Sequence, residues 1–205
     1  MDFIVSAGNA EAVAAVDAWP AWPGGALALI GPEGSGKTHL ARAWALRSAA
    51  TVLEPGRPEI ADLPNGPILL ENADGEAADE MLFHLINRAE TEGGLLLTAR
   101  RPPRAWPTEL PDLRSRLNAL PVTDLGAPDD AILEGAMLNL FRERNIRPDP
   151  DLLPYLLRRI ERSVPSARAL VERLDEAGDA AKRNITRALA REILETEDPT
   201  GDLFD

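Results

Sequence analysis

Near its start the chain contains the stretch Ala26-Leu27-Ala28-Leu29-Ile30-Gly31-Pro32-Glu33-Gly34-Ser35-Gly36-Lys37-Thr38, in which an apolar run leads into a complete G-x-x-x-x-G-K-[ST] pattern. The apolar run suits a buried strand, and residues 38–48 suit a helix. A glycine-rich turn between the two directs backbone N–H groups and the positive end of a helix at one spot. The stretch therefore predicts a phosphate-binding loop, in which Lys37 neutralises β and γ oxygens and Thr38 offers a hydroxyl to Mg²⁺. The alternative is a glycine turn beside a solvated lysine.

Composition narrows the class of protein. The chain has 205 residues, enough for one domain with a second small one, and 22 basic against 34 acidic residues give a net charge of -12. Such a surplus of acid repels a phosphate backbone, so we expect no autonomous DNA binding. The absence of cysteine excludes disulfides and cysteine-bound zinc. Because the chain also shows no signal peptide and no apolar run of membrane-spanning length, we expect a soluble, cytoplasmic protein without membrane contact.

Strands and helices alternate in the first part of the chain. Short apolar runs predict buried strands, and a capped segment after Asn9 and an apolar stripe in residues 77–91 predict helices. This alternation predicts an α/β fold, a P-loop three-layer sandwich with a mostly parallel five-stranded sheet. The expected strands are 26–30, 51–53, 68–70, 95–98 and 119–122, and the expected helices are 10–19, 38–48, 77–91 and 110–118.

The sequence pattern changes after Gly126-Ala127-Pro128, because only helical periodicity follows and no further strand is expected. We therefore expect a nucleotide-binding core in residues 1–125, a small all-helical lid subdomain in residues 128–196 and a flexible tail in residues 197–205. The expected helices of the lid are 129–144, 151–163, 166–177 and 186–195.

A second nucleotide motif is expected where the strand at residues 68–70 ends. Glu71 stands where P-loop ATPases place an acid that holds the water shell of Mg²⁺, although it is one methylene longer than the usual aspartate. The next residue, Asn72, cannot accept a proton from an attacking water. We therefore expect tight nucleotide binding with weak or absent intrinsic hydrolysis. Asp74 is expected to cap the following helix, and the alternative for Glu71 is a surface carboxylate at a strand end.

Three further side chains are candidates for contact with a nucleotide. Thr98 ends the fourth strand, where a polar group can sense the γ-phosphate. Arg114 and Arg116 lie on the short helix 110–118, from which an arginine can reach the nucleotide of a neighbouring subunit and stabilise charge on its γ-phosphoryl group. Two arginines on a helix can equally form a solvated face. The two histidines of the chain make no metal site.

From Phe3 to about Leu194 the sequence resembles the AAA+ family, in its DnaA clade, and within that clade the Hda-type regulators. The resemblance rests on Phe3-Ile4-Val5 followed by Asn9, on Lys37-Thr38-His39-Leu40, on Thr98-Ala99-Arg100-Arg101-Pro102-Pro103 and on Leu113-Arg114-Ser115-Arg116-Leu117. It implies that Arg116 is an arginine finger acting in trans and that Phe3 and Val5 line an adenine pocket. The implied nucleotide-binding residues are Phe3, Val5, Gly31, Pro32, Glu33, Gly34, Ser35, Gly36, Lys37, Thr38, His39 and Thr98, with Thr38 and Glu71 serving Mg²⁺.

The resemblance also implies a role and partners. Hda-type regulators carry ADP or ATP, associate with the sliding clamp of DNA polymerase and promote hydrolysis of the ATP held by the DnaA initiator. The helix-turn-helix domain that follows the lid in DnaA is absent from this sequence, which agrees with the acidic charge. In that setting Asn72 is no defect, because the hydrolysing site belongs to the partner. The oligomeric state stays open.

The sequence departs from the family in several places. Arg100 stands at the sensor I position, where DnaA has an acid, and Pro165 stands at the sensor II arginine, with Arg168 one turn later. No glutamine-containing clamp peptide precedes Phe3. The tail, however, ends Asp202-Leu203-Phe204-Asp205, and we expect Leu203 and Phe204 to bind the clamp unless they form an incidental terminus.

Two other functions remain open from the sequence. One is an AAA+ ATPase of the remodeler or helicase-loader type, which needs a water-activating group that Asn72 does not supply. The other is an adaptor without catalysis, whose nucleotide only gates its shape.

Overall fold

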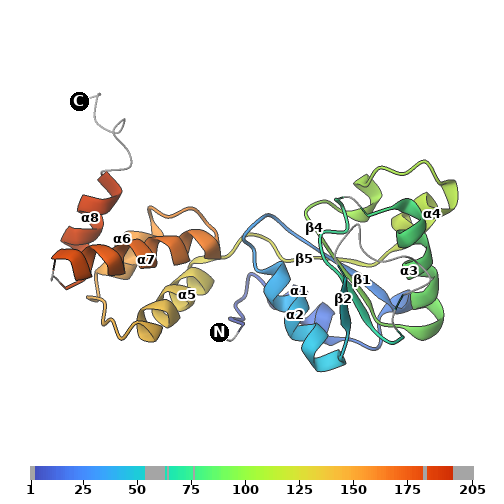
Figure 1. Ribbon diagram of the computed structural model, residues 1–205, viewed down its shortest axis with the longest axis horizontal. Coiled ribbons are helices and arrows are strands. Elements are labelled where there is room, and N and C mark those ends of the chain that lie inside the picture. Colours follow the sequence, from blue (N-terminus) through green and yellow to red (C-terminus); the bar gives the residue numbers. More distant parts are fainter. Residues whose placement is uncertain (1–2, 54–62, 64, 76, 182–183, 196–205) are drawn as a thin grey trace. The chain divides into compact units, whose positions relative to one another are not determined.

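The structure is a computed structural model that describes residues 3–53, 63, 65–75, 77–181 and 184–195. These residues form two compact units, one of residues 5–127 and one that joins residues 3–4 to the chain from Pro128 onward. Figure 1 shows both units, with most of their helices and strands labelled. Among the described residues, no helix combines the length and the hydrophobicity needed to cross a bilayer.

Five strands in the described part of unit 5–127 form one parallel sheet, in the order β2-β3-β4-β1-β5. The central strands are buried on both faces, which explains their continuous apolar runs. The α/β prediction is confirmed. The strands are β1 (Ala26–Ile30), β2 (Thr51–Leu53), β3 (Ile68–Leu70), β4 (Leu95–Ala99) and β5 (Val122–Asp124).

Helices cover both faces of this sheet, so the unit has three layers (Figure 1). On one face lie α1 (Ala10–Asp17) and α2 (Lys37–Ser48), which contact each other and β1. On the other lie α3 (Asp79–Glu92) and α4 (Pro111–Ala119). Two short 3₁₀ turns, η1 (Pro23–Gly25) and η3 (Pro103–Ala105), precede β1 and α4. Because parallel strands end at the same edge, the segments that follow β1, β3, β4 and β5 share that edge of the sheet.

The start of β5 was predicted three residues too early. Residues 119–122 were expected as the strand, whereas Leu120 is buried in the core and β5 runs from Val122 to Asp124. The register explains the shift, because Val122 pairs with Ala28 of β1 while the Pro121 carbonyl accepts from the Ala28 N–H at 2.9 Å. Pro121 has no N–H to donate, so it can only flank the ladder.

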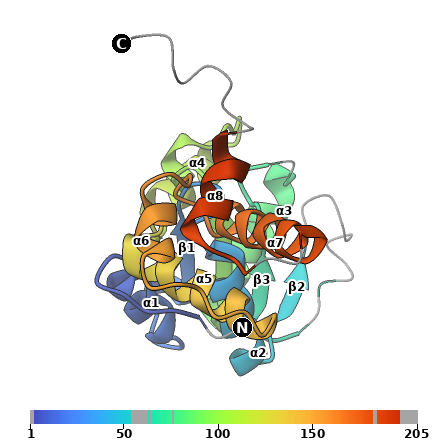
Figure 2. The same ribbon diagram turned by 90° about the vertical axis from the view of Figure 1, so that its left-hand side faces the viewer.

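The second unit is a small helical bundle, seen face-on in Figure 2. It contains α5 (Asp130–Glu143), α6 (Leu152–Leu157), α7 (Val164–Ala181) and α8 (Arg187–Glu195). Asp129 caps α5 by accepting from the Ile132 N–H at 2.9 Å. Fully buried Leu140, Phe141, Leu156, Val171 and Leu174 lie in its core.

Three helix boundaries of this bundle differ by more than one residue from those expected. The helix predicted over 151–163 ends as α6 at Leu157, and the one predicted over 166–177 runs as α7 from Val164 to Ala181. Pro165 therefore falls in the first turn of α7, where its missing N–H costs no helical hydrogen bond. Pro165, which lay between the two expected helices, is thus part of the start of α7.

Candidate functional site

The segment Gly31–Thr38 connects the carboxyl end of β1 to the first turn of α2. Its glycines make this turn possible, since Gly34 and Gly36 have φ values of 74° and 97°, in the left-handed region that other residues avoid. Gly36 is the N-cap of α2, and no described side chain caps that helix start. The first-turn N–H groups of a twelve-residue helix therefore remain available to an anion.

Lys37 lies folded over this loop and is only 9% exposed. Its Nζ donates to the carbonyls of Gly31 at 2.8 Å and Pro32 at 2.7 Å. Burial lowers the pKa of the Lys37 ammonium from its usual value, and the nearby Arg100 guanidinium lowers it further. Three carboxylates, those of Asp74, Glu33 and Asp124, oppose this lowering of the pKa without reversing it. An anionic ligand would counter both causes of the shift and hold the ammonium charged.

Ser35 supplies a second sign of an anion site. Its Oγ is buried and has no hydrogen-bond partner among the residues that the structure describes. A buried hydroxyl without a partner is uncommon in folded proteins and calls for a ligand or water. The same oxygen lies 3.1 Å from where a Cβ on Gly31 would stand, so glycine keeps this hollow open. The residues present therefore fit the phosphates of a nucleotide.

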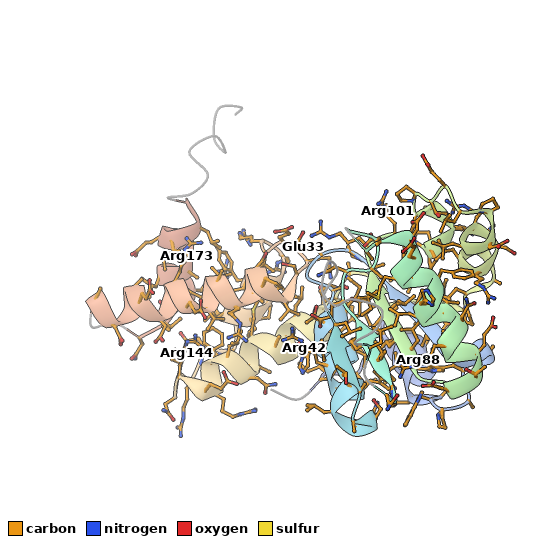
Figure 3. The ribbon with its side chains drawn as sticks, turned by 45° about the vertical axis from the view of Figure 1, so that its right-hand side comes forward. Glu33, Arg42, Arg88, Arg101, Arg144 and Arg173 are labelled. Atoms are coloured by element: carbon orange, nitrogen blue, oxygen red, sulfur yellow. The ribbon has the colours of Figure 1, made fainter. Side chains whose placement is uncertain are left out.

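Charged groups from the neighbouring strand ends surround the loop. Glu33 pairs with Arg100 across 2.8 Å (Figure 3 labels Glu33). Asp74 does not cap α3 as expected, because Ala78 is the N-cap and Asp74 Oδ2 instead accepts from the backbone N–H groups of Arg100 and Arg101, each at 3.1 Å. Asp74 thus ties the β3–α3 segment to the end of β4. Sequence reasoning missed this link because the partners lie 26 and 27 residues apart.

The end of β3 holds Glu71 in an ion pair. Arg42 of α2 donates to its two carboxylate oxygens at 3.0 and 3.1 Å, and Glu71 is only 6% exposed. Asn72 follows with a φ of 54°, a left-handed conformation that asparagine tolerates better than most residues. Thr98 Oγ1 accepts from the Asn72 N–H at 3.0 Å, so this hydroxyl supports the turn after β3. The sensing role of Thr98 and the metal role of Glu71 stay predictions.

Arg116 lies near the opposite edge of the sheet from the loop. It pairs with Glu90 of α3, and its guanidinium carbon lies 5.3 Å from the centre of the Phe83 ring. Arg116, Glu90 and Phe83 line a cavity of about 520 Å³. Pro23, Gly24 and Pro121, which precede β1 and β5, line the same cavity. The five residues of β1 separate this edge from the loop by about 16 Å. Arg116 therefore does not share a site with the loop of its own chain.

Arg114, two residues earlier on α4, has a structural role. Its guanidinium donates to the carbonyls of Arg104 at 3.0 Å and Trp106 at 2.6 Å. These contacts hold η3 against α4. Of the two arginines that the sequence proposed, Arg114 is used within the fold and Arg116 faces a cavity.

The remaining predicted residues are less confined. Thr38 and His39 are exposed on the first turn of α2, and Val5 is 58% exposed. Phe3 is half-buried in the unit that also holds the helical bundle, where its neighbour Ile4 packs against Gly135 of α5. Arg168, named beside Pro165, pairs with Glu172 one turn later on α7. Leu203 and Phe204 lie outside the described residues.

No family model matches the chain, but solved structures share its fold. Domain III of the replication initiation protein DnaA from Thermotoga maritima aligns with a TM-score of 0.74 at 16% identity, over 97% of this chain and 95% of that one. The AMPPCP-bound DnaA from Aquifex aeolicus aligns with a TM-score of 0.72 at 18% identity, over 96% of this chain and 68% of that one. The RuvB Holliday junction branch migration motor of Thermotoga maritima aligns with a TM-score of 0.71 at 16% identity, over 95% of this chain and 70% of that one.

These likenesses show a DnaA-like AAA+ fold. They extend over nearly the whole chain, so both the sheet unit and the helical bundle have counterparts in those proteins.

Proposed function

We propose that this chain binds ADP or ATP in the loop Gly31–Thr38. The observation that carries the proposal is the loop itself, with a buried lysine at one place with a buried Ser35 hydroxyl and the start of α2, neither of which has a partner or cap among the described residues. Each of these groups is stabilised by phosphate oxygens. The AMPPCP-bound DnaA of the same fold supports an adenine nucleotide as the ligand.

Calorimetric titration with ADP and ATP tests this binding. We expect heat from the unchanged chain and a loss of affinity of about 100-fold or more in Lys37→Ala, because one charged hydrogen-bond donor to phosphate contributes about 3 kcal/mol. The matched control is Arg47→Ala, since Arg47 pairs with Asp17 on the surface of α1 and α2. Its affinity should equal that of the unchanged chain. A folded chain that gives no heat with either nucleotide would refute the proposal.

We further propose that the chain is an Hda-type regulator of replication initiation, which promotes hydrolysis of ATP bound to the DnaA initiator with Arg116 acting in trans. The separation of Arg116 from the loop of its own chain supports a finger that serves another subunit. A guanidinium beside a transferring phosphoryl group stabilises the developing charge there. In this role the chain acts with the sliding clamp and needs little turnover of its own, in keeping with the neutral Asn72.

The finger is tested by the ATPase rate of DnaA in the presence of this chain and the DNA-loaded clamp. Arg116→Ala should bind ADP normally yet lose stimulation by about 100-fold or more, within the range that arginine fingers contribute. Arg116→Lys should also be deficient, because an ammonium lacks the planar fork of a guanidinium. Undiminished stimulation by Arg116→Ala would contradict the assignment. Rapid ATP turnover by the isolated chain would instead favour an AAA+ remodeler.

A further inference from the structure

The ion pair between Glu71 and Arg42 occupies a position where P-loop proteins commonly direct a carboxylate toward the metal of the nucleotide. Arg42 lies four residues after Thr38, so the two side chains project from the same face of α2, one turn apart. The pair is bidentate, with Nε to Oε1 at 3.0 Å and Nη2 to Oε2 at 3.1 Å. Both Glu71 oxygens are thus engaged by the same guanidinium.

The environment makes this pairing costly to break. Glu71 is 6% exposed, whereas the Arg42 side chain is 59% exposed and holds the carboxylate from the solvent side. A buried carboxylate that loses its cation is strongly destabilised, because little water replaces the partner. For Glu71 to serve a hydrated metal, the metal would have to displace a guanidinium that already neutralises its charge.

The other oxygen donors near the loop do not complete a divalent site. Thr38 offers a neutral hydroxyl and Asn72 a neutral amide. The carboxylate of Asp74 accepts from two backbone N–H groups, and that of Asp124 accepts from the Gly126 N–H at 2.8 Å. No group of three acidic or histidine side chains that could hold a metal occurs in the described part of the chain. Mg²⁺ is normally held by one or two carboxylates besides phosphate, so these residues do not fit it.

We propose that Arg42 takes the place of the divalent cation as the partner of Glu71, and that the loop binds its nucleotide without a metal requirement. This inference rests on the proposed nucleotide binding. It concerns charge balance, since the Arg42 guanidinium neutralises the Glu71 carboxylate next to the loop, as Mg²⁺ does elsewhere. Lys37 and the α2 N–H groups then hold the phosphates directly.

The test is calorimetric titration of the full chain with ADP in Mg²⁺ buffer and in EDTA. We expect the two dissociation constants to agree within about threefold, a difference below 1 kcal/mol. Tighter binding in Mg²⁺ by more than about tenfold would overturn the inference while leaving the nucleotide site in place. Absence of heat in both buffers, from a chain shown to be folded by circular dichroism, would overturn the nucleotide site and this inference together.

Variants of the Arg42–Glu71 pair test whether this pair is the reason that binding needs no metal. In Arg42→Gln the Glu71 charge is no longer balanced, so we expect ADP affinity in EDTA to fall by about tenfold and Mg²⁺ to restore it. Removing both charges in Arg42→Gln with Glu71→Gln should make binding independent of the metal again. Arg47→Gln on the same helix, whose partner is Asp17, is the matched control and should behave as the unchanged chain. Metal independence that persists in folded Arg42→Gln would contradict the role given to Arg42.

Discussion

At the scale of single residues, Lys37 is the group whose charged form the site disfavours most clearly. It is a buried ammonium held by two carbonyl oxygens, beside the like charge of Arg100. Burial and that neighbour both disfavour its charged form, which lowers its pKa. A phosphate group that replaces or joins the carbonyls would favour the charged form. The proposed nucleotide affinity and Lys37 protonation should therefore be linked.

This linkage predicts a pH dependence of binding. The charged lysine is the binding form, so ADP affinity should be highest below the lowered pKa of Lys37 in the free protein and should fall as the pH rises through it. Titrations above about pH 8 isolate this effect, because the phosphates of ADP are already ionised there. Replacing Arg100 with glutamine removes a charge that lowers the pKa, so the decline should move to higher pH. A decline at the same pH in both proteins would contradict the coupling.

At the scale of elements, the turn into β1 positions the loop that follows. Here η1 lies against α3, and the Gly25 carbonyl accepts from the Gly94 N–H at 2.8 Å. A Cβ on Gly25 would stand 2.0 Å from the Ala89 carbonyl oxygen, while a Cβ on Gly24 would meet no described atom within 4 Å. The backbones of α3 and this turn therefore approach each other as closely as glycine permits.

The two glycines form a matched pair for a stability measurement. Both have positive φ, of 64° at Gly24 and 69° at Gly25, so alanine costs each about 1 kcal/mol in backbone strain. Gly25→Ala adds a collision with the α3 backbone, and we expect it to lower the free energy of unfolding by more than about 3 kcal/mol. Gly24→Ala should show only the backbone cost. Urea denaturation measures both, and equal losses would contradict the close packing of η1 on α3.

At the scale of the whole molecule, the chain combines two units with separate hydrophobic cores and a net charge of -12. The loop Gly31–Thr38, proposed to bind the nucleotide, belongs to unit 5–127, while Phe3, predicted to contact the adenine, belongs with the helical bundle. The acidic balance favours protein partners over direct contact with DNA. In the proposed regulation of DnaA, the chain would reach DNA through the sliding clamp, which is part of the same proposal.

The clamp contact is predicted to depend on Leu203 and Phe204, which lie outside the described residues. Surface plasmon resonance with immobilised clamp should show binding by the full chain and its loss when residues 200–205 are removed. The double substitution Leu203→Ala with Phe204→Ala should match the deletion, because an apolar clamp pocket captures these two side chains. Thr200→Ala is the control and should bind normally. Equal binding by the full and shortened chains would rule out the tail as the contact.

Local patterns in the chain were sufficient for the architecture. The strands at Thr51–Leu53 and Ile68–Leu70 were predicted to the residue, because short apolar runs between turns have few other uses in an alternating α/β chain. The boundary of β5 was not predicted correctly, because it depends on how Val122 pairs with Ala28, almost a hundred residues away. Pairing of that kind leaves no periodic signal.

The same division holds for the site. The glycine spacing and Lys37 could be read directly, since a phosphate loop is a local backbone conformation whose residue types follow from its φ values. The partners that tune it could not: Arg42 on Glu71, Asp74 on the β4 end and Glu90 on Arg116 join residues 26 to 29 positions apart. The amino-acid order alone thus specified the α/β class and the loop, through periodicity and backbone preference. Folding alone brought those charges together, because contact between distant residues depends on how helices and strands pack.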